Sequence, residues 1–203
     1  IKEYANTGYI SAVIYRLPGV FGKWSRPNYN SVVSTFCYNI ARNIPIDVRD
    51  TKHEISLVYI VDVVKSLTSH LKQTHGDLVF AEVQLVYTVT LGELASRIKS
   101  FPKLRKTLYA PKVGDSLEKK LYSTYLSYLP IKNFSYPLDL KKDDRGDLFE
   151  WIKSDDFGQI FVSTTKPGVT RGNHYHHMKT EKFLVIRGEA EIKFRNIVSD
   201  EVI

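Results

Sequence analysis

One stretch decides how the last third of the chain is interpreted: Gly168-Val-Thr-Arg-Gly-Asn-His174-Tyr-His176-His177-Met-Lys-Thr-Glu181-Lys-Phe-Leu-Val-Ile-Arg-Gly188. Alternate side chains of a strand share a face, so His174 and His176 are predicted to point one way and His177 the other. Glu181 follows a short turn and opens the next predicted strand. Two imidazoles and a carboxylate on adjacent antiparallel strands suit a zinc, iron, manganese or nickel ion.

The clustering alone leaves two interpretations open, a metal site or a solvated polar strand end without metal. The sequence around the cluster has no helical period from about residue 132 onward, and turn residues separate its short apolar runs. This pattern predicts an all-β module. Its predicted strands are Leu148–Ile152, Gln159–Thr164, Lys182–Ile186 and Glu189–Phe194.

The spacing within the stretch resembles the first sequence motif of the cupin superfamily. The match comprises Gly168, five residues, His174-x-His176, four residues, Glu181, six residues and Gly188. This resemblance implies an all-β cupin jelly roll in which the glycines supply the turns. It also implies that His174, His176 and Glu181 are metal ligands, with zinc as the expected metal. The second motif of the family, which supplies a further histidine ligand, is not in the sequence, so we expect an incomplete site.

The first 131 residues predict a different architecture, because strand-like and helix-like runs alternate. This alternation is typical of an α/β arrangement with a parallel component. Thr90 with Glu93, and Asp115 with Glu118, have the spacing of a capping box, and Asp62 is a candidate helix cap. The predicted strands are 9–16, 54–60 and 85–90, and the predicted helices are 31–43, 62–71, 91–101 and one that follows residue 115.

The charge of the 203-residue chain is unevenly distributed. Residues 1–131 hold 17 basic and 10 acidic residues, whereas residues 132–203 hold 12 of each. This difference in net charge suggests two segments with different partners. The basic residues are dispersed apart from a cluster of Arg97, Lys99, Lys103, Arg105 and Lys106, and no base-reading motif accompanies them. We therefore expect no nucleic-acid partner; a phosphate-bearing small molecule needs only a few such charges.

The cysteine content and the lack of long apolar stretches indicate where in the cell the protein is expected. The single cysteine, Cys37, excludes an intramolecular disulfide framework, and it lies in an apolar run that predicts a buried, inert thiol. A lone cysteine is compatible with a reducing compartment, and we expect a cytoplasmic protein. No stretch approaches the roughly 20 apolar residues of a membrane helix, so no membrane partner is expected.

Residues 12–30 and 54–64 resemble the second half of an extended short-chain dehydrogenase acting on nucleotide sugars. Arg16-Leu-Pro-Gly-Val-Phe-Gly22 is similar to the family's Arg-x-Pro-Asn-x-Phe/Tyr-Gly, with Gly19 in place of Asn. The resemblance implies a nucleotide-sugar pocket in which Lys23 and Arg26 meet the diphosphate and Trp24 stacks on a ring. A solvated basic loop is the alternative, and Arg16 and Asp62 fit a structural salt bridge or a helix cap equally well. The implied pocket residues are Arg16, Lys23, Trp24, Arg26, Asn28 and Asn30.

The combination of the two halves resembles the bifunctional capsular-polysaccharide enzymes that make precursors of UDP-N-acetyl-L-fucosamine. Runs that carry the resemblance include 21–24, 27–32, 121–130, 144–146 and 172–174. The resemblance implies that a cupin domain epimerises a UDP-linked 2-acetamido-dideoxy-hexulose and that a reductase domain then reduces the keto group with NADPH. A bound metal would stabilise the enolate, His176 would help to hold it, and His177 or a water is the candidate base. A non-catalytic sugar-binding or dimerisation cupin and an iron-dependent oxygenase remain alternatives.

The length indicates an internal piece of such an enzyme. No GxxGxxG loop and no Tyr-x-x-x-Lys pair precede the Arg16 strand, and residues 132–203 are 72, whereas an eight-stranded jelly roll needs roughly 80–100. We expect residues 1–131 to be the C-terminal, substrate-binding part of the reductase domain and residues 132–203 the N-terminal part of a cupin. We expect this chain to be inactive alone, and a homodimer is left open.

Overall fold

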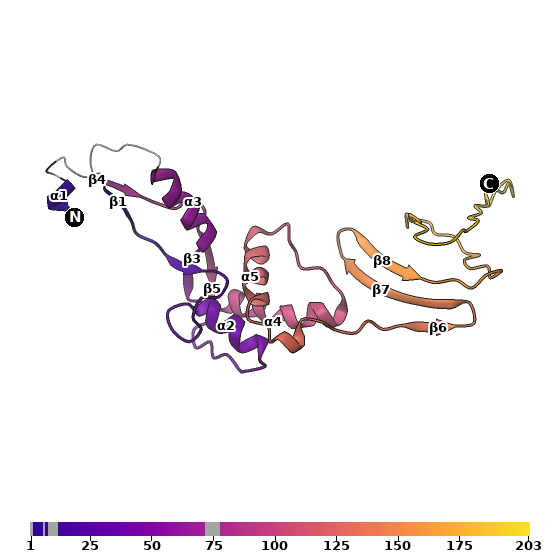
Figure 1. Ribbon diagram of the computed structural model, residues 1–203, viewed down its shortest axis with the longest axis horizontal. Helices are drawn as coiled ribbons and strands as arrows, with labels where there is room; N and C mark the ends of the chain where they lie inside the picture. The colour runs from indigo at the N-terminus through magenta and orange to yellow at the C-terminus, as the bar shows by residue number, and fades with distance from the viewer. Residues whose placement is uncertain (1, 6, 8–11, 72–77) are drawn as a thin grey trace. The chain divides into compact units, whose positions relative to one another are not determined.

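The computed structural model describes residues 2–5, 7, 12–71 and 78–203 (Figure 1). Its internal contacts divide the chain into two units, residues 1–165 and 166–203, which are described separately. The predicted strand 9–16 lies partly outside the described residues, and its described part is β1 (Ala12–Tyr15). The division of function at residue 131 stays a prediction.

The strands in the first half of unit 1 form two small sheets. β1 pairs in parallel with β4 (Leu78–Ala81). In the second sheet, β3 (Glu54–Tyr59) pairs in parallel with β2 (Gly19–Phe21) and antiparallel with β5 (Tyr87–Thr90). The parallel component predicted from the alternating pattern is therefore present.

β2 forms in the segment Pro18 to Gly22, although its proline and two glycines favour a loop. Gly19 allows the two strands to approach closely, since a Cβ there would lie 3.1 Å from the carbonyl oxygen of Ser56. The backbone of this segment pairs with Leu57 to Tyr59 in β3. Pairing with a neighbouring strand thus overrides the local turn preference of the sequence.

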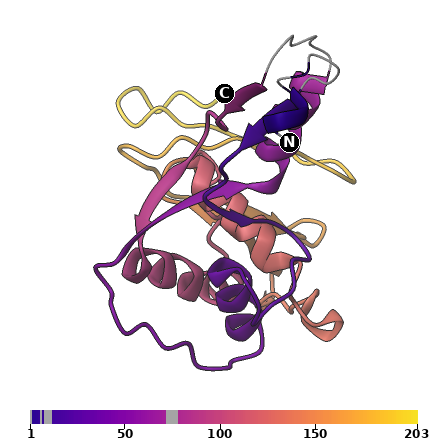
Figure 2. The same ribbon diagram turned by 90° about the vertical axis from the view of Figure 1, so that its left-hand side faces the viewer.

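The helices of unit 1 are α1 (Lys2–Ala5), α2 (Val32–Ala41), α3 (Ile60–Leu71), α4 (Leu91–Thr107), α5 (Ser116–Leu126) and the short 3-10 turn Ile131–Asn133. α2, α4 and α5 pack together around the main core, and they lie close to one another in the turned view (Figure 2). Fully buried side chains at this junction include Val33, Leu94, Ile98, Phe101 and Leu121. No helix in the described ranges combines the length and apolar character needed to cross a membrane.

Both predicted helix starts on α4 and α5 are confirmed. Thr90 Oγ1 accepts a hydrogen bond from the Glu93 backbone at 3.1 Å, and the Glu93 carboxylate accepts one from the Thr90 backbone at 3.1 Å, which is a complete capping box. Asp115 caps α5 by accepting from the backbone N–H groups of Leu117 and Glu118. The Glu118 side chain does not close a second box, because it binds Arg97 instead.

Two helix boundaries differ from the predictions. α4 continues past residue 101 through Pro102 to Thr107, because Leu104 packs against the core and Arg105 binds backbone carbonyls. α3 begins at Ile60, so Asp62 lies in its first turn and is not a cap. The carboxylate of Asp62 pairs with Lys120 of α5 at 2.6 Å. Of the two interpretations of Asp62, the structure therefore shows the structural salt bridge.

Unit 1 ends in an antiparallel sheet of order β6-β7-β8, made of β6 (Lys141–Asp143), β7 (Gly146–Ser154) and β8 (Gly158–Ser163) (Figure 1). The predicted strands 148–152 and 159–164 are thus confirmed, with a bulge between Glu150 and Ile152. Lys153 ties this sheet to the preceding part of the unit, because its backbone exchanges hydrogen bonds of 2.8 and 2.9 Å with Ala110 and Leu108.

Unit 2, residues 166–203, contains no strand. The predicted strands 182–186 and 189–194 are therefore wrong. A strand needs a neighbour to satisfy its N–H and C=O groups, and residues 182–193 make no backbone hydrogen bond with any described residue, whereas Phe194 bonds only to Ile203. Phe183 and Leu184 are exposed. The one paired site is a bridge between Arg195 and Val202 that closes a terminal turn. The strands of the all-β cupin jelly roll expected from the sequence are accordingly absent from this unit.

Candidate functional sites

The candidate metal cluster lies in unit 2. One ligand atom from each of His174, His176 and Glu181 can be chosen so that all lie within 4.8 Å of one another. His176 Nε2 is 3.6 Å from Glu181 Oε1, and the two imidazole rings lie 4.8 Å apart between centroids. All three residues are exposed. The structure therefore brings together the three residues that the sequence predicts as ligands.

His177 does not join this group. Its ring packs edge-on against Tyr175, with 5.1 Å between the centroids and 87° between the planes. His174 and His176 form one pair and Tyr175 and His177 another, which is the alternation of an extended chain. This local alternation holds although the segment pairs with no neighbouring strand.

Three glycines with a left-handed backbone flank the cluster. Gly168, Gly172 and Gly188 have φ values of 75°, 97° and 84°. Glycine adopts this conformation without the steric cost that a Cβ imposes. Gly168 lies in a turn and Gly188 in a bend, which agrees with the turns expected at these two glycines.

Lys179 contacts the carboxylate of the cluster. Its Nζ lies 2.6 Å from Glu181 Oε1, and this hydrogen bond is the main cause that holds the pKa of Glu181 below its usual range. Glu181 therefore presents an ionised oxygen beside two imidazoles, a donor set that fits a divalent cation. Lys179 already binds one oxygen of the Glu181 carboxylate and would compete with the metal for it.

The second candidate site is a cavity of about 470 Å³ beside β2. Lys23, Arg26 and Asn30, three of the six predicted pocket residues, line it. Arg16, Trp24 and Asn28 lie outside the lining, and the Arg16 guanidinium sits 6.0 Å from the Phe80 ring centre. The remaining lining residues are Pro18, Gly19, Val20, Phe21, Gly22, Ser25, Tyr29, Ser31 and Ile60.

The loop that forms this cavity is fastened by residues that the sequence did not single out. The Tyr128 hydroxyl donates to the Ser25 carbonyl, and the Trp24 backbone N–H reaches Ser127 Oγ at 3.4 Å. From α2, Thr35 Oγ1 accepts from the Asn28 backbone at 3.0 Å. The end of α5 and the start of α2 therefore hold the loop from both sides.

Two cations that line the cavity lie beside exposed aromatic rings. The Arg26 guanidinium lies 5.2 Å from the centre of the Tyr29 ring, and Lys23 Nζ lies 5.9 Å from that of Trp24. The side chain of Trp24 is 80% exposed. Positive charge beside flat rings suits a ligand that carries both phosphate and a planar base.

Comparisons with known proteins relate the chain to enzymes of polysaccharide biosynthesis. Residues 141–203 match the family described as polysaccharide biosynthesis C-terminal domain. The chain is 51% identical over 186 residues to UDP-2-acetamido-2,6-beta-L-arabino-hexul-4-ose reductase from Pseudomonas aeruginosa, covering 92% of this chain and 50% of that protein. The resemblance to capsular-polysaccharide enzymes seen in the sequence is confirmed.

A solved structure gives the same result. The chain superposes on the capsular polysaccharide assembling protein CapF from Staphylococcus aureus with a TM-score of 0.91 and 46% identity, covering 99% of this chain and 55% of that one. The chain thus spans about half the length of the relatives it matches. It is a homologue of a UDP-sugar reductase and of CapF.

Proposed function

We propose that the protein acts on a UDP-linked 2-acetamido-dideoxy-hexulose during the synthesis of capsular-polysaccharide precursors. Residues 132–203 belong to a cupin domain that supports epimerisation at C3, and residues 1–131 belong to the substrate-binding part of an NADPH-dependent reductase domain that acts on the C4 ketone. The observation that carries this proposal is the 51% identity to a UDP-sugar reductase along 92% of the chain.

In the cupin part, His174, His176 and Glu181 hold a divalent metal, with zinc as the expected ion. A bound metal of this kind supplies a Lewis acid that stabilises the enolate formed when a proton leaves the carbon beside a ketone. His177 is the candidate base, because its imidazole is adjacent in sequence to the ligand His176 and is not taken up by the cluster. A water activated nearby is the alternative base.

In the reductase part, the cavity beside β2 holds the nucleotide-sugar. Lys23 and Arg26 line it and provide positive charge for the diphosphate. Asn30 adds an amide that both donates and accepts hydrogen bonds. Trp24 remains exposed at the edge, where it is available to stack on the base or the sugar.

Epimerisation is tested by solvent exchange in the whole protein. The zinc-loaded protein is mixed with the UDP-linked ketosugar in deuterium oxide, and mass spectrometry follows deuterium uptake at the carbon beside the ketone. We expect uptake with the unchanged protein and with Lys182→Met, and loss of uptake with His176→Ala. No uptake by the unchanged protein would exclude the epimerase.

Protein purified without added metal separates the alternative functions. Bound iron together with oxygen consumption that depends on the sugar would favour an oxygenase. Sugar binding without bound metal and without exchange would favour a binding or dimerisation module. The reductase step is followed independently as NADPH oxidation with the same sugar.

A further inference from the structure

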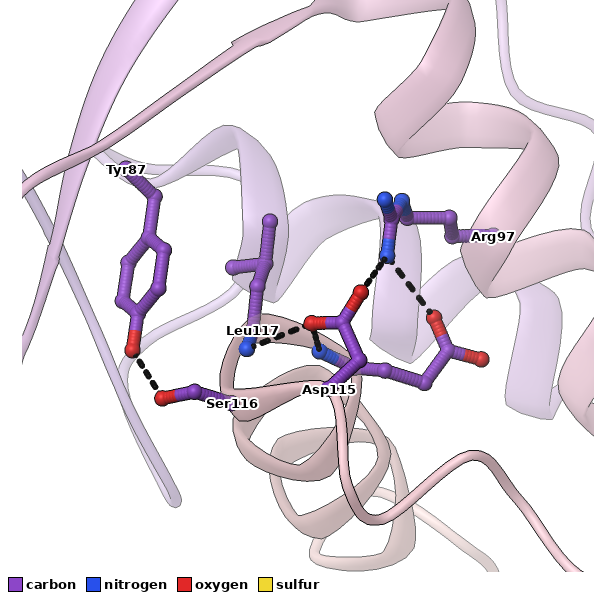
Figure 3. Close-up of polar contacts among 6 residues, drawn as sticks. Tyr87, Arg97, Asp115, Ser116 and Leu117 are labelled. Carbon is purple, nitrogen blue, oxygen red and sulfur yellow. Dashed lines mark hydrogen bonds and ion pairs between the residues drawn. The ribbon is translucent and has the colours of Figure 1, made fainter.

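The basic cluster of α4 separates into two sets in the structure. Arg97 is engaged by acids of α5, with Nη1 2.9 Å from Asp115 and 3.3 Å from Glu118 (Figure 3). Arg105 donates to the carbonyls of Asn133 and Phe134 at 2.5 and 2.9 Å. Both arginines therefore serve packing within unit 1.

The lysines of the same helix have no such partners. Lys99 and Lys103 lie one turn apart on the exposed side of α4, and no ion pair or hydrogen bond engages either ammonium within the described residues. Both line a hollow of about 600 Å³ between α4 and the segment before β3. We call this hollow the α4 groove; its lining is Val48, Thr51, Gly92, Ala95, Ser96, Lys99, Ser100 and Lys103.

Backbone hydrogen bonds join the segment before β3 to the first turn of α4. The Gly92 backbone donates to the Thr51 carbonyl at 3.0 Å, and the Leu91 backbone donates to the His53 carbonyl at 2.9 Å. A Cβ on Gly92 would lie 2.8 Å from the Thr51 oxygen, so the two segments are in close contact. Backbone contacts therefore fix the shape of the groove.

The polar groups of the groove favour an anion. Its lining contains two ammonium groups and no carboxylate. The Ser96 and Thr51 hydroxyls make no hydrogen bond within the described residues, so they are free to donate, whereas the Ser100 hydroxyl already donates to the Arg97 carbonyl at 2.7 Å.

The acids that adjoin the lining residues in sequence are engaged elsewhere. Asp47 pairs with Arg49 at 3.2 Å, and Asp50 accepts from the Lys52 backbone at 3.0 Å. The Glu93 carboxylate belongs to the capping box at the start of α4. These contacts leave the charge of Lys99 and Lys103 available to a ligand.

We propose that the α4 groove binds a small phosphorylated ligand. Lysines four residues apart on a helix are neighbours, at about 5–6 Å between Cβ atoms, so both can contact one phosphate or diphosphate. Val48, Ala95 and Gly92 supply an apolar floor for the organic part. The volume falls in the range of small-molecule sites, roughly 300–1,000 Å³. This site shares no residue with the cavity beside β2 and does not depend on the proposed function.

Inorganic pyrophosphate is the probe for the test. Amide chemical shifts of the ¹⁵N-labelled protein are followed during titration at low ionic strength. We expect saturable shifts at Thr51, Ser96 and Ser100, and at least a tenfold weaker affinity in the double variant Lys99→Gln/Lys103→Gln. The control is Lys106→Gln, which removes an exposed charge from the same helix outside the groove and should change the affinity less than twofold.

Three outcomes would overturn the proposal. The first is the absence of saturable shifts at the groove. The second is an equal loss in Lys106→Gln, which would indicate diffuse attraction to a basic surface. The third is shifts confined to Lys23, Arg26 and Asn30, which would indicate a single phosphate site beside β2. Thermal unfolding checks that the double variant is folded, and we expect a cooperative transition near that of the wild type because both lysines are exposed.

Discussion

A guanidinium nitrogen of Arg97 in α4 lies 2.9 Å from Oδ2 of Asp115, the residue that caps α5 (Figure 3). Asp115 thus serves two purposes, because its other oxygen accepts from the backbone of Leu117 and Glu118. The backbone hydrogen bond from Glu118, followed by the one from Arg97, lowers the pKa of Asp115. One carboxylate therefore starts a helix and joins it to its neighbour.

We predict that the stabilisation from Asp115 depends on pH. A carboxylate whose pKa is lower in the folded protein stabilises the fold above its unfolded pKa, and this contribution is lost as the pH falls through the folded pKa. Asp115→Asn, which can still cap the helix, should lower the free energy of unfolding at pH 7 but have little effect in strong acid. Asp115→Ala should cost about 1 kcal/mol more, since it also removes the cap.

Urea unfolding of the wild type and both variants, from pH 7 to acid, measures these differences. Asp155→Asn is the control, because Asp155 is exposed and its carboxylate makes no hydrogen bond or ion pair with any residue that the structure describes. A wild-type advantage over Asp115→Asn that stays constant across the pH range would contradict the assigned ionic contribution.

Cys37 should be unreactive while the protein is folded. Its side chain is fully buried in α2, and burial raises the pKa of the thiol. A thiol reagent such as dithionitrobenzoate should therefore react at the rate of unfolding in buffer and at once in concentrated denaturant. Rapid labelling under native conditions would show that the thiol reaches solvent without unfolding.

The features that the sequence predicted are those set by local chemistry. The cap of α4 depends on Thr90 and Glu93, and that of α5 depends on Asp115 and the two amides after it. β2 was missed, because its backbone forms a strand only where β3 lies alongside. The predicted strand 182–186 failed for the converse reason, since apolar residues alone provide no backbone partner.

The two candidate sites also differ in whether local sequence or distant contacts determine them. His174, His176 and Glu181 are close in sequence, so their spacing is enough to predict the cluster. The loop beside β2 depends on distant residues, because Ser127 and Tyr128 contact it across about one hundred positions. No local pattern distinguishes Tyr128 from Tyr122 and Tyr125 of α5, the helix that precedes it.

Tyr128 should act as a positioning residue for the cavity beside β2. Tyr128→Phe removes only the hydroxyl that donates to the Ser25 carbonyl, so the loop bearing Lys23 and Arg26 is less well fixed. We expect UDP to bind several-fold more weakly, measured by calorimetry. Tyr122→Phe is the matched control, since the Tyr122 hydroxyl makes no hydrogen bond within the described residues. Equal affinity in the Tyr128 variant and the wild type would contradict this role.

Lys179 should weaken metal binding by competing for Glu181. Its ammonium lies 2.6 Å from the carboxylate oxygen, so a cation bound by the cluster has to displace it. Lys179→Met should therefore raise the affinity for zinc by about two- to fivefold, the range expected for loss of an exposed ion pair. Lys182→Met removes an adjacent charge that does not contact the carboxylate, and it should leave the affinity nearly unchanged. Competition with a zinc indicator dye measures both variants. If the two substitutions raise the affinity equally, the effect comes from net charge and not from the contact with Glu181.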